Sequence, residues 1–167
     1  AGNDGQLFEP PIELGMTARV PAPWIAGQAY NASSAGVITV GGTAYQCDAS
    51  FLSGSRGPAT WGHVAPWGDW PYNPGAGLIK PDLVAPAVGI CSTIPPNEYS
   101  GDTWVGTSMA CPQAAGVAAL MLEKNPSLSP AAIDSVLETT AHDLGVAGKD
   151  NVFGSGLIDA YAAVNAV

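Results

Sequence analysis

The segment from Gln113 to Lys124 is rich in alanine and apolar on nearly all sides of a helical projection, so it predicts a buried helix. Pro112 suits the first turn of this helix, and Asn125-Pro126 ends it. A helix without a broad polar face has to be surrounded by other secondary structure. The chain is therefore expected to fold as layers around this segment.

The rest of the chain supplies elements for such layers. Short apolar runs predict three strands, at residues 36–42, 83–86 and 88–94. After the buried helix, Ser129 can cap a second helix that has Pro130 at its first position. A third helix is expected from Leu157 to about Ala166. Strands mixed with helices, one of them fully buried, predict a layered α/β domain.

Two stretches show no periodicity. Residues 6–35 hold prolines and small polar residues and are expected to form a loop. Residues 58–77 contain three tryptophans and predict an ordered, Trp-rich insertion loop, because aromatic side chains at this density seldom stay in solvent. Since we find no internal repeat and no linker, residues 1–167 are expected to belong to a single domain.

Composition limits the partners of this chain. Its 167 residues are 47% apolar, which excludes a disordered tail, and carry a formal charge of −9. So acidic a surface repels phosphate backbones and argues against a nucleic-acid partner. No apolar run approaches the roughly 20 residues that cross a bilayer. The chain opens on AGNDG without a signal peptide or an initiator Met, so we expect that it was cut from a precursor or that a companion chain carries the rest.

The three cysteines are too few for a disulfide scaffold and too scattered for a metal site; they are Cys47, Cys91 and Cys111. Their odd number leaves at least one thiol free or paired with a segment outside this chain. No Asp/Glu cluster has the spacing of a calcium loop. The sequence thus predicts no metal site in this chain.

The segment Gly106-Thr-Ser-Met-Ala-Cys-Pro is the most informative one. It places Ser108 at a glycine-led turn directly before the buried helix, where unpaired N–H groups and partial positive charge favour an anionic intermediate. The small residues Gly106 and Ala110 leave room for a substrate carbonyl group. The alternative is that Ser108 only caps the helix, and the local pattern does not separate the two.

The segment GTSMACPQAAGVAAL closely resembles the nucleophile motif of the subtilisin-like serine proteases, or subtilases. Further resemblances to this family follow in the right order along the chain: AGNDG, GVITVGG with FLSGSRGP, KPDLVAPAVGICST, and the closing segments NPSLSPAAIDSVLETTAHDLG and GSGLIDAYAAV. Only residues at about 6–30 and 58–77 fall outside these matches. One departure is Gln113, which stands where many subtilases have a histidine that is not the catalytic one.

The resemblance implies a three-layer α/β domain with a mainly parallel sheet, of which this chain is the C-terminal half. It implies that Ser108 is the nucleophile and that Asn3 donates a side-chain N–H to the oxyanion, beside the Ser108 backbone N–H. For Asn3 the alternative is a turn residue, since Asn before Asp-Gly often is one. The resemblance also implies a set of substrate-binding residues: Gly2, Asp4, Gly106 and Thr107. Asp4 would disfavour acidic substrate side chains, and its alternative is a solvated loop residue.

Subtilases place the catalytic Asp and His before the oxyanion asparagine, which in this sequence is matched by the third residue, Asn3. We therefore expect a separate N-terminal fragment of the same protease to supply both groups, because the serine needs a base. The two histidines of the chain, His63 and His142, are expected to be a loop residue and a structural residue.

The function implied is that of an extracellular serine endopeptidase that cleaves peptides or proteins through an acyl-enzyme, without a cofactor. Calcium is frequent in the family, but no motif in this chain supports it. Two alternatives stay open. The first is a catalytically silent domain that binds or regulates, and the second is a peptide cyclase or transamidase.

Overall fold

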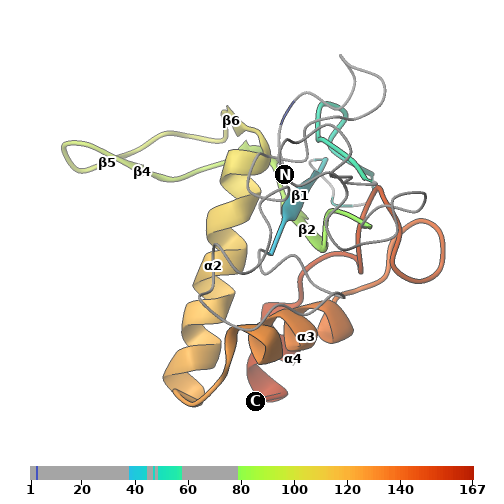
Figure 1. Cartoon of the computed structure of the whole chain (residues 1–167). Coiled ribbons are helices and arrows are strands. Elements are labelled where there is room, and N and C mark those ends of the chain that lie inside the picture. Colours follow the sequence, from blue (N-terminus) through green and yellow to red (C-terminus); the bar gives the residue numbers. More distant parts are fainter. Residues whose placement is uncertain (1–2, 4–37, 45–46, 48, 58–78) are drawn as a thin grey trace, which may run out of the picture.

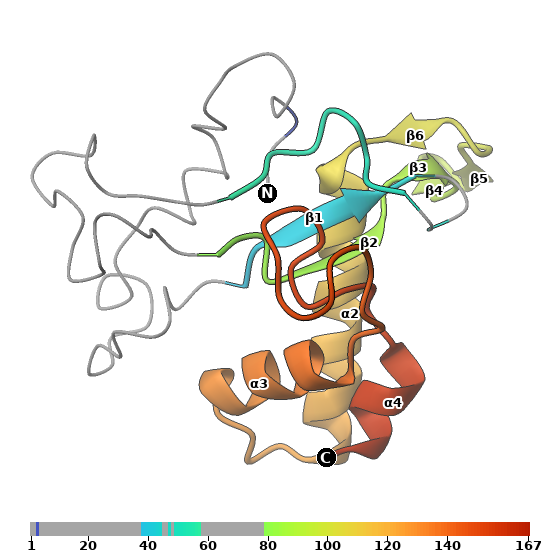
Figure 2. The ribbon, with the colours of Figure 1, turned by 90° about the vertical axis from the view of Figure 1, so that its right-hand side faces the viewer.

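The computed structural model describes Asn3 and residues 38–44, 47, 49–57 and 79–167. The predicted loop at 6–35, the Trp-rich insertion at 58–77, the predicted substrate-binding residues Gly2 and Asp4, and His63 lie outside the described residues. Figures 1 and 2 show two views at a right angle to each other.

Two parallel strands form the centre of the described structure. Strand β1 (Val40–Thr43) pairs with β2 (Leu83–Pro86) in the register Val40↔Leu83. Both strands are buried along nearly their whole length, as expected for a parallel pair covered on its faces. The strand predicted at 83–86 is confirmed, and the one predicted at 36–42 is shifted to β1.

Helix α2 (Thr107–Lys124) runs beside this pair, with α3 (Pro130–Thr140) and α4 (Ala160–Asn165) at its far end (Figures 1 and 2). The core lies between α2, the strands and the two short helices, and its largest members are Leu83, Met121 and Leu137. Ser129 caps α3 by accepting a hydrogen bond from the N–H of Ala132 at 3.2 Å, so this predicted cap is confirmed. Helix α4 begins later than predicted, because residues up to Ile158 lie beside β2 as extended chain.

The start of α2 was predicted wrongly. The helix begins at Thr107, so Ser108 lies inside it and Pro112 lies beyond its first turn. The reason is Gly106, whose φ of 136° is a backbone conformation that favours glycine. The preceding strand ends directly before this residue, and the helix begins directly after it.

The prediction that this helix is buried on all sides is also wrong for the described part of the chain. Ala110, Val117 and Met121 are buried on one face, whereas Ala115, Ala119 and Leu122 are exposed on the opposite face. Within the described residues, α2 therefore has one covered face and one open apolar face.

Residues 88–105 form an antiparallel ribbon that projects from the body beside the start of α2 (Figure 1). In it β3 (Val88–Ile90) pairs with β6 (Trp104–Val105), and β4 (Thr93–Ile94) pairs with β5 (Glu98–Tyr99). The single strand predicted at 88–94 is thus two short strands. The sequence of residues 88–94 could not show this division, because it arises from pairing with the later strands β5 and β6. Among the described residues, no helix has the length and apolar character needed to span a membrane.

Candidate active site

Ser108 is the second residue of α2 and is exposed. The turn before it is fixed by the N–H of Gly106, which donates to the carbonyl oxygen of Ala87 at 2.8 Å. The serine hydroxyl is therefore presented at the N-terminal end of a long helix, where the first-turn N–H groups carry partial positive charge.

Asn3 lies against the same turn, although it is remote in sequence. Its side-chain oxygen accepts hydrogen bonds from the backbone N–H and the hydroxyl of Thr107, each at 2.9 Å. Since the oxygen takes both bonds, the amide nitrogen is on the other side, and a Cβ placed on Gly106 would stand 3.2 Å from it. The structure thus brings together four of the predicted site residues: Asn3, Gly106, Thr107 and Ser108.

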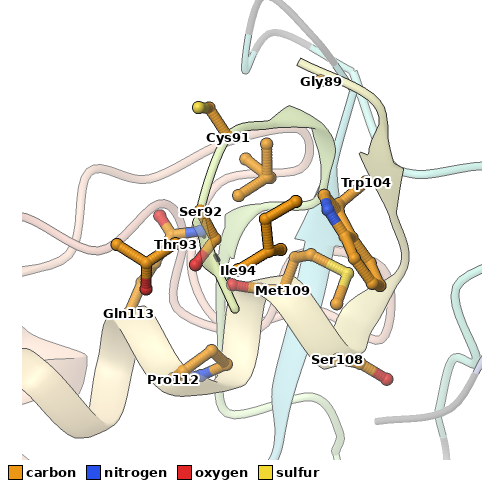
Figure 3. Close-up of a pocket in the computed structure, with 11 residues that line it drawn as sticks. Gly89, Cys91, Ser92, Thr93, Ile94, Trp104, Ser108, Met109, Pro112 and Gln113 are labelled. Atoms are coloured by element: carbon orange, nitrogen blue, oxygen red, sulfur yellow. Dashed lines mark hydrogen bonds between the residues drawn. The ribbon is translucent and has the colours of Figure 1, made fainter. Parts of the chain in front are cut away.

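A cavity of about 690 Å³ lies between the ribbon and the first turns of α2 (Figure 3). Figure 3 shows Ser108 at one end of it, near Trp104 and Met109, with its hydroxyl pointing outward. The walls are mostly apolar, and their members are Gly89, Ile90, Cys91, Ser92, Thr93, Ile94, Trp104, Ser108, Met109, Pro112 and Gln113. Sequence reasoning missed the ribbon as a wall of this cavity. A signal for it was the position of Trp104, only four residues before Ser108.

The backbone of His142 pairs with that of Leu157, which does not line the cavity beside Ser108. It exchanges two hydrogen bonds with Leu157, His142 N–H to the Leu157 carbonyl oxygen at 2.7 Å and the reverse at 2.8 Å. It is not among the residues that line the cavity. This placement agrees with the structural role expected for His142.

The opposite end of β2 carries a buried charge cluster that the sequence analysis did not predict. The carboxylate of Asp82 contacts the ammonium groups of Lys80 and Lys149 and accepts the backbone N–H of Thr39 at 2.7 Å. Lys149 also contacts Glu138 on α3. Asp82 directly precedes β2, whereas the turn before Ser108 is bonded to Ala87, just after the other end of β2. Because the cluster and the serine lie at opposite ends of this strand, we interpret the cluster as structural.

Two pKa values are shifted here, that of Lys149 in the cluster and that of Asp134, which lies on α3 like Glu138. Burial raises the pKa of Asp134 from 3.8 to about 6, and the negative charges of Asp82 and Glu138 add to this. Burial alone would lower the pKa of Lys149, but Asp82 and Glu138 outweigh it and raise that pKa.

The described residues include no group of three or more His, Cys, Asp or Glu side chains that could hold a metal ion. The three cysteines are all free thiols in this structure. No disulfide bond therefore joins any two of these three cysteines.

The model of the subtilase family matches residues 1–156. The chain belongs to the subtilase family. It is 36% identical to Subtilisin BL of Lederbergia lenta over 171 residues, which cover 98% of this chain and 58% of that protein. It is 52% identical to Alkaline elastase YaB of Bacillus sp. (strain YaB) over 89 residues, which cover 53% of this chain and 21% of that protein.

Among solved structures, that of the Clostridium perfringens CspB protease matches with a TM-score of 0.59 and 30% sequence identity. The match covers 77% of this chain and 26% of that protease. The predicted fold class, a subtilisin-like α/β domain of which this chain is the C-terminal portion, is thereby confirmed. The chain spans at most 58% of the length of these subtilases.

Proposed function

We propose that this chain carries the nucleophile and the oxyanion donors of a serine endopeptidase. The observation that supports this most is the contact of Asn3 with Thr107, which places the asparagine side chain beside the turn that presents Ser108. In this proposal the Ser108 oxygen gives its proton to a general base and attacks the scissile carbonyl carbon. The peptide C–N bond then breaks, the amine leaves with that proton, and water hydrolyses the acyl-enzyme that remains.

The oxyanion of the tetrahedral intermediate would be stabilised by two donors. One is the backbone N–H of Ser108, in the first turn of α2, and the other is the side-chain nitrogen of Asn3. Thr107 holds the asparagine oxygen and so favours the orientation in which the nitrogen is free to donate. No cofactor is needed, because every group in this mechanism belongs to the protein.

The general base is proposed to come from another part of the same protease, which carries the His and the Asp. Among the described residues, those that line the cavity beside Ser108 include no imidazole and no carboxylate. The open apolar face of α2, with Ala115, Ala119 and Leu122, is the kind of surface that another part of a domain covers. We propose that this part packs there and brings its histidine to Ser108.

The substrate is proposed to be an extracellular peptide or protein. Gly106 and Thr107 would line its path next to the nucleophile, together with Gly2 and Asp4 from the segment around Asn3. The mostly apolar cavity between the ribbon and α2 would accept part of the substrate near the scissile bond.

The proposal is tested with the full-length protease, in wild-type form and as Ser108→Ala. Wild type should hydrolyse a test peptide, with product masses that show addition of one water, and Ser108→Ala should be inactive. Ser127→Ala is the matched control, because Ser127 contacts only the end of α2 through Asn125, and it should be fully active. Products whose masses sum to that of the substrate, with no added water, would favour a cyclase, and equal activity of Ser108→Ala would overturn the proposal.

A further inference from the structure

Pro112 lies inside α2, four residues after Ser108. In an uninterrupted helix, the N–H of residue 112 would donate to the carbonyl oxygen of Ser108, but proline has no N–H. The turn that carries the serine is therefore held by fewer intrahelical hydrogen bonds than the rest of α2. Contacts from outside this backbone pattern must then contribute to its position.

The side chain of Gln113 makes such contacts. Its Nε2 atom donates to the carbonyl oxygen of Pro86 at 2.8 Å and to that of Met109 at 2.9 Å. Both acceptors are carbonyl oxygens, so only the nitrogen end of the amide satisfies both. One side chain thus links Pro86, the last residue of β2, to Met109, which follows Ser108. Figure 3 shows Gln113 and Met109 on the first turns of α2.

A second link holds the other side of the serine. The N–H of Gly106 donates to the carbonyl oxygen of Ala87, and the N–H of Ala87 donates to that of Thr43 at 3.1 Å. Thr43 ends β1, and Ala87 directly follows β2. The start of α2 is therefore fastened to the buried strand pair both before and after Ser108.

We propose that Gln113 is a positioning residue, which holds the first turn of α2 and the Ser108 hydroxyl in the place that acylation requires. This inference rests on the proposed peptidase function. It assigns to the glutamine side chain a task that Pro112 prevents the helix backbone from performing alone. A displacement of about 1 Å at a reacting group can lower a rate about 10²-fold, so a loosened turn has a measurable cost.

The test uses Gln113→Met in the full-length protease, since methionine keeps the length of the side chain and removes both donors. We expect kcat to fall about 10- to 100-fold with KM within about twofold of wild type, because the donor atom of Gln113 is bound to two backbone carbonyl oxygens and is not free to bind substrate. The rate constant for fluorophosphonate labelling should fall by the same factor. A residue with a merely structural role would lower the melting temperature without this selective loss of kcat.

Lys124→Met is the matched control. It removes a side-chain hydrogen bond to a carbonyl oxygen, that of Val164 at 2.9 Å, from the other end of the same helix. We expect it to change the melting temperature about as much as Gln113→Met does, with kcat unchanged.

Gln113→His is the second variant, and it decides the matter where Gln113→Met does not fold. A neutral imidazole has one N–H, so it keeps one of the two hydrogen bonds and should lose less of kcat, about 3- to 10-fold. Values of kcat within twofold of wild type for the folded variants would overturn the positioning role. Activity or labelling that persists in Ser108→Ala would instead overturn the proposed function itself.

Discussion

The side-chain oxygen of Asn3 accepts hydrogen bonds from both the backbone N–H and the hydroxyl of Thr107. Asn3 and Thr107 are 104 positions apart in the sequence. These bonds fix the rotation of the asparagine amide, because its nitrogen cannot replace the oxygen as their acceptor. The nitrogen is consequently directed to the side of Gly106. This relationship is the basis of the first two predictions.

Thr107→Val should lower kcat by about 5- to 10-fold, the effect of losing about 1 kcal/mol from one hydrogen bond. The valine side chain has nearly the same shape and lacks the hydroxyl that donates to Asn3. Thr107→Ser keeps the hydroxyl and should stay within about twofold of wild type. Steady-state kinetics on both variants check this, and an equal loss of kcat in the two would show that the threonine hydroxyl is not responsible.

Asn3→Ala should lower kcat with little change in KM, because an oxyanion donor acts mainly in the transition state. A loss of about 10²–10³-fold is known for such a donor in subtilisin, a relative, and is not a value derived from this structure. Asn3→Asp should be at least as damaging, since it places a negative charge next to a developing anion. A variant that melts at a lower temperature but turns over normally would make Asn3 a turn residue.

The sequence predicted those elements whose signals are local. The cap at Ser129 and the strand Leu83–Pro86 needed only nearby residues to be recognised. The start of α2 was predicted too late, because proline usually lies in the first turn of a helix, whereas here the helix begins directly after Gly106. Pro112 removes one hydrogen bond inside the helix, while Gln113 and Gly106 bond the same end of α2 to Pro86 and Ala87.

The site could be predicted only as far as the motif around Ser108 reaches. The link between Gln113 and Pro86 and the contact of Lys149 with Asp82 join residues 27 and 67 positions apart. No periodicity or spacing in the sequence indicates which of these distant groups meet. The catalytic roles of Ser108 and Asn3 stay predictions for the experiments described here.

Asp134 should make stability depend on pH. Its folded pKa of about 6 lies above its ordinary value of 3.8, so the folded state holds the proton more tightly than the unfolded state. The free energy of unfolding therefore falls as pH rises from about 4 to 6 and stays lower above that range. Asp134→Asn should remove this decrease and raise stability at pH 8 by about 1–2 kcal/mol, after allowance for partial solvent contact.

Urea unfolding of the full-length protease at pH 4 and pH 8 checks this prediction. Glu123→Gln is the matched control, because it removes one negative charge from an exposed position on α2. The control should leave the pH dependence unchanged. An increase of the same size at both pH values, or a lower stability of Asp134→Asn at pH 8, would contradict the assignment.

Lys149→Met should destabilise the fold by about 1–3 kcal/mol, because it leaves two carboxylates close together without the cation between them. The ammonium group joins Asp82, at the start of β2, to Glu138 on α3. Lys124→Met removes a lysine that contacts only a backbone carbonyl oxygen at the surface, and should cost less. Thermal unfolding of both variants checks this, and equal losses would show that the cluster adds nothing specific.

The most direct test of the account is to label the full-length protease with a fluorophosphonate and to map the modified peptide. Ser108 is exposed at the N-terminal end of α2 and directly follows Thr107, which donates a hydrogen bond to Asn3. We predict a single adduct on Ser108, formed only when the segment with the His and Asp is intact. An adduct on another serine, or no adduct on an intact protease, would contradict the role of Ser108 as the nucleophile.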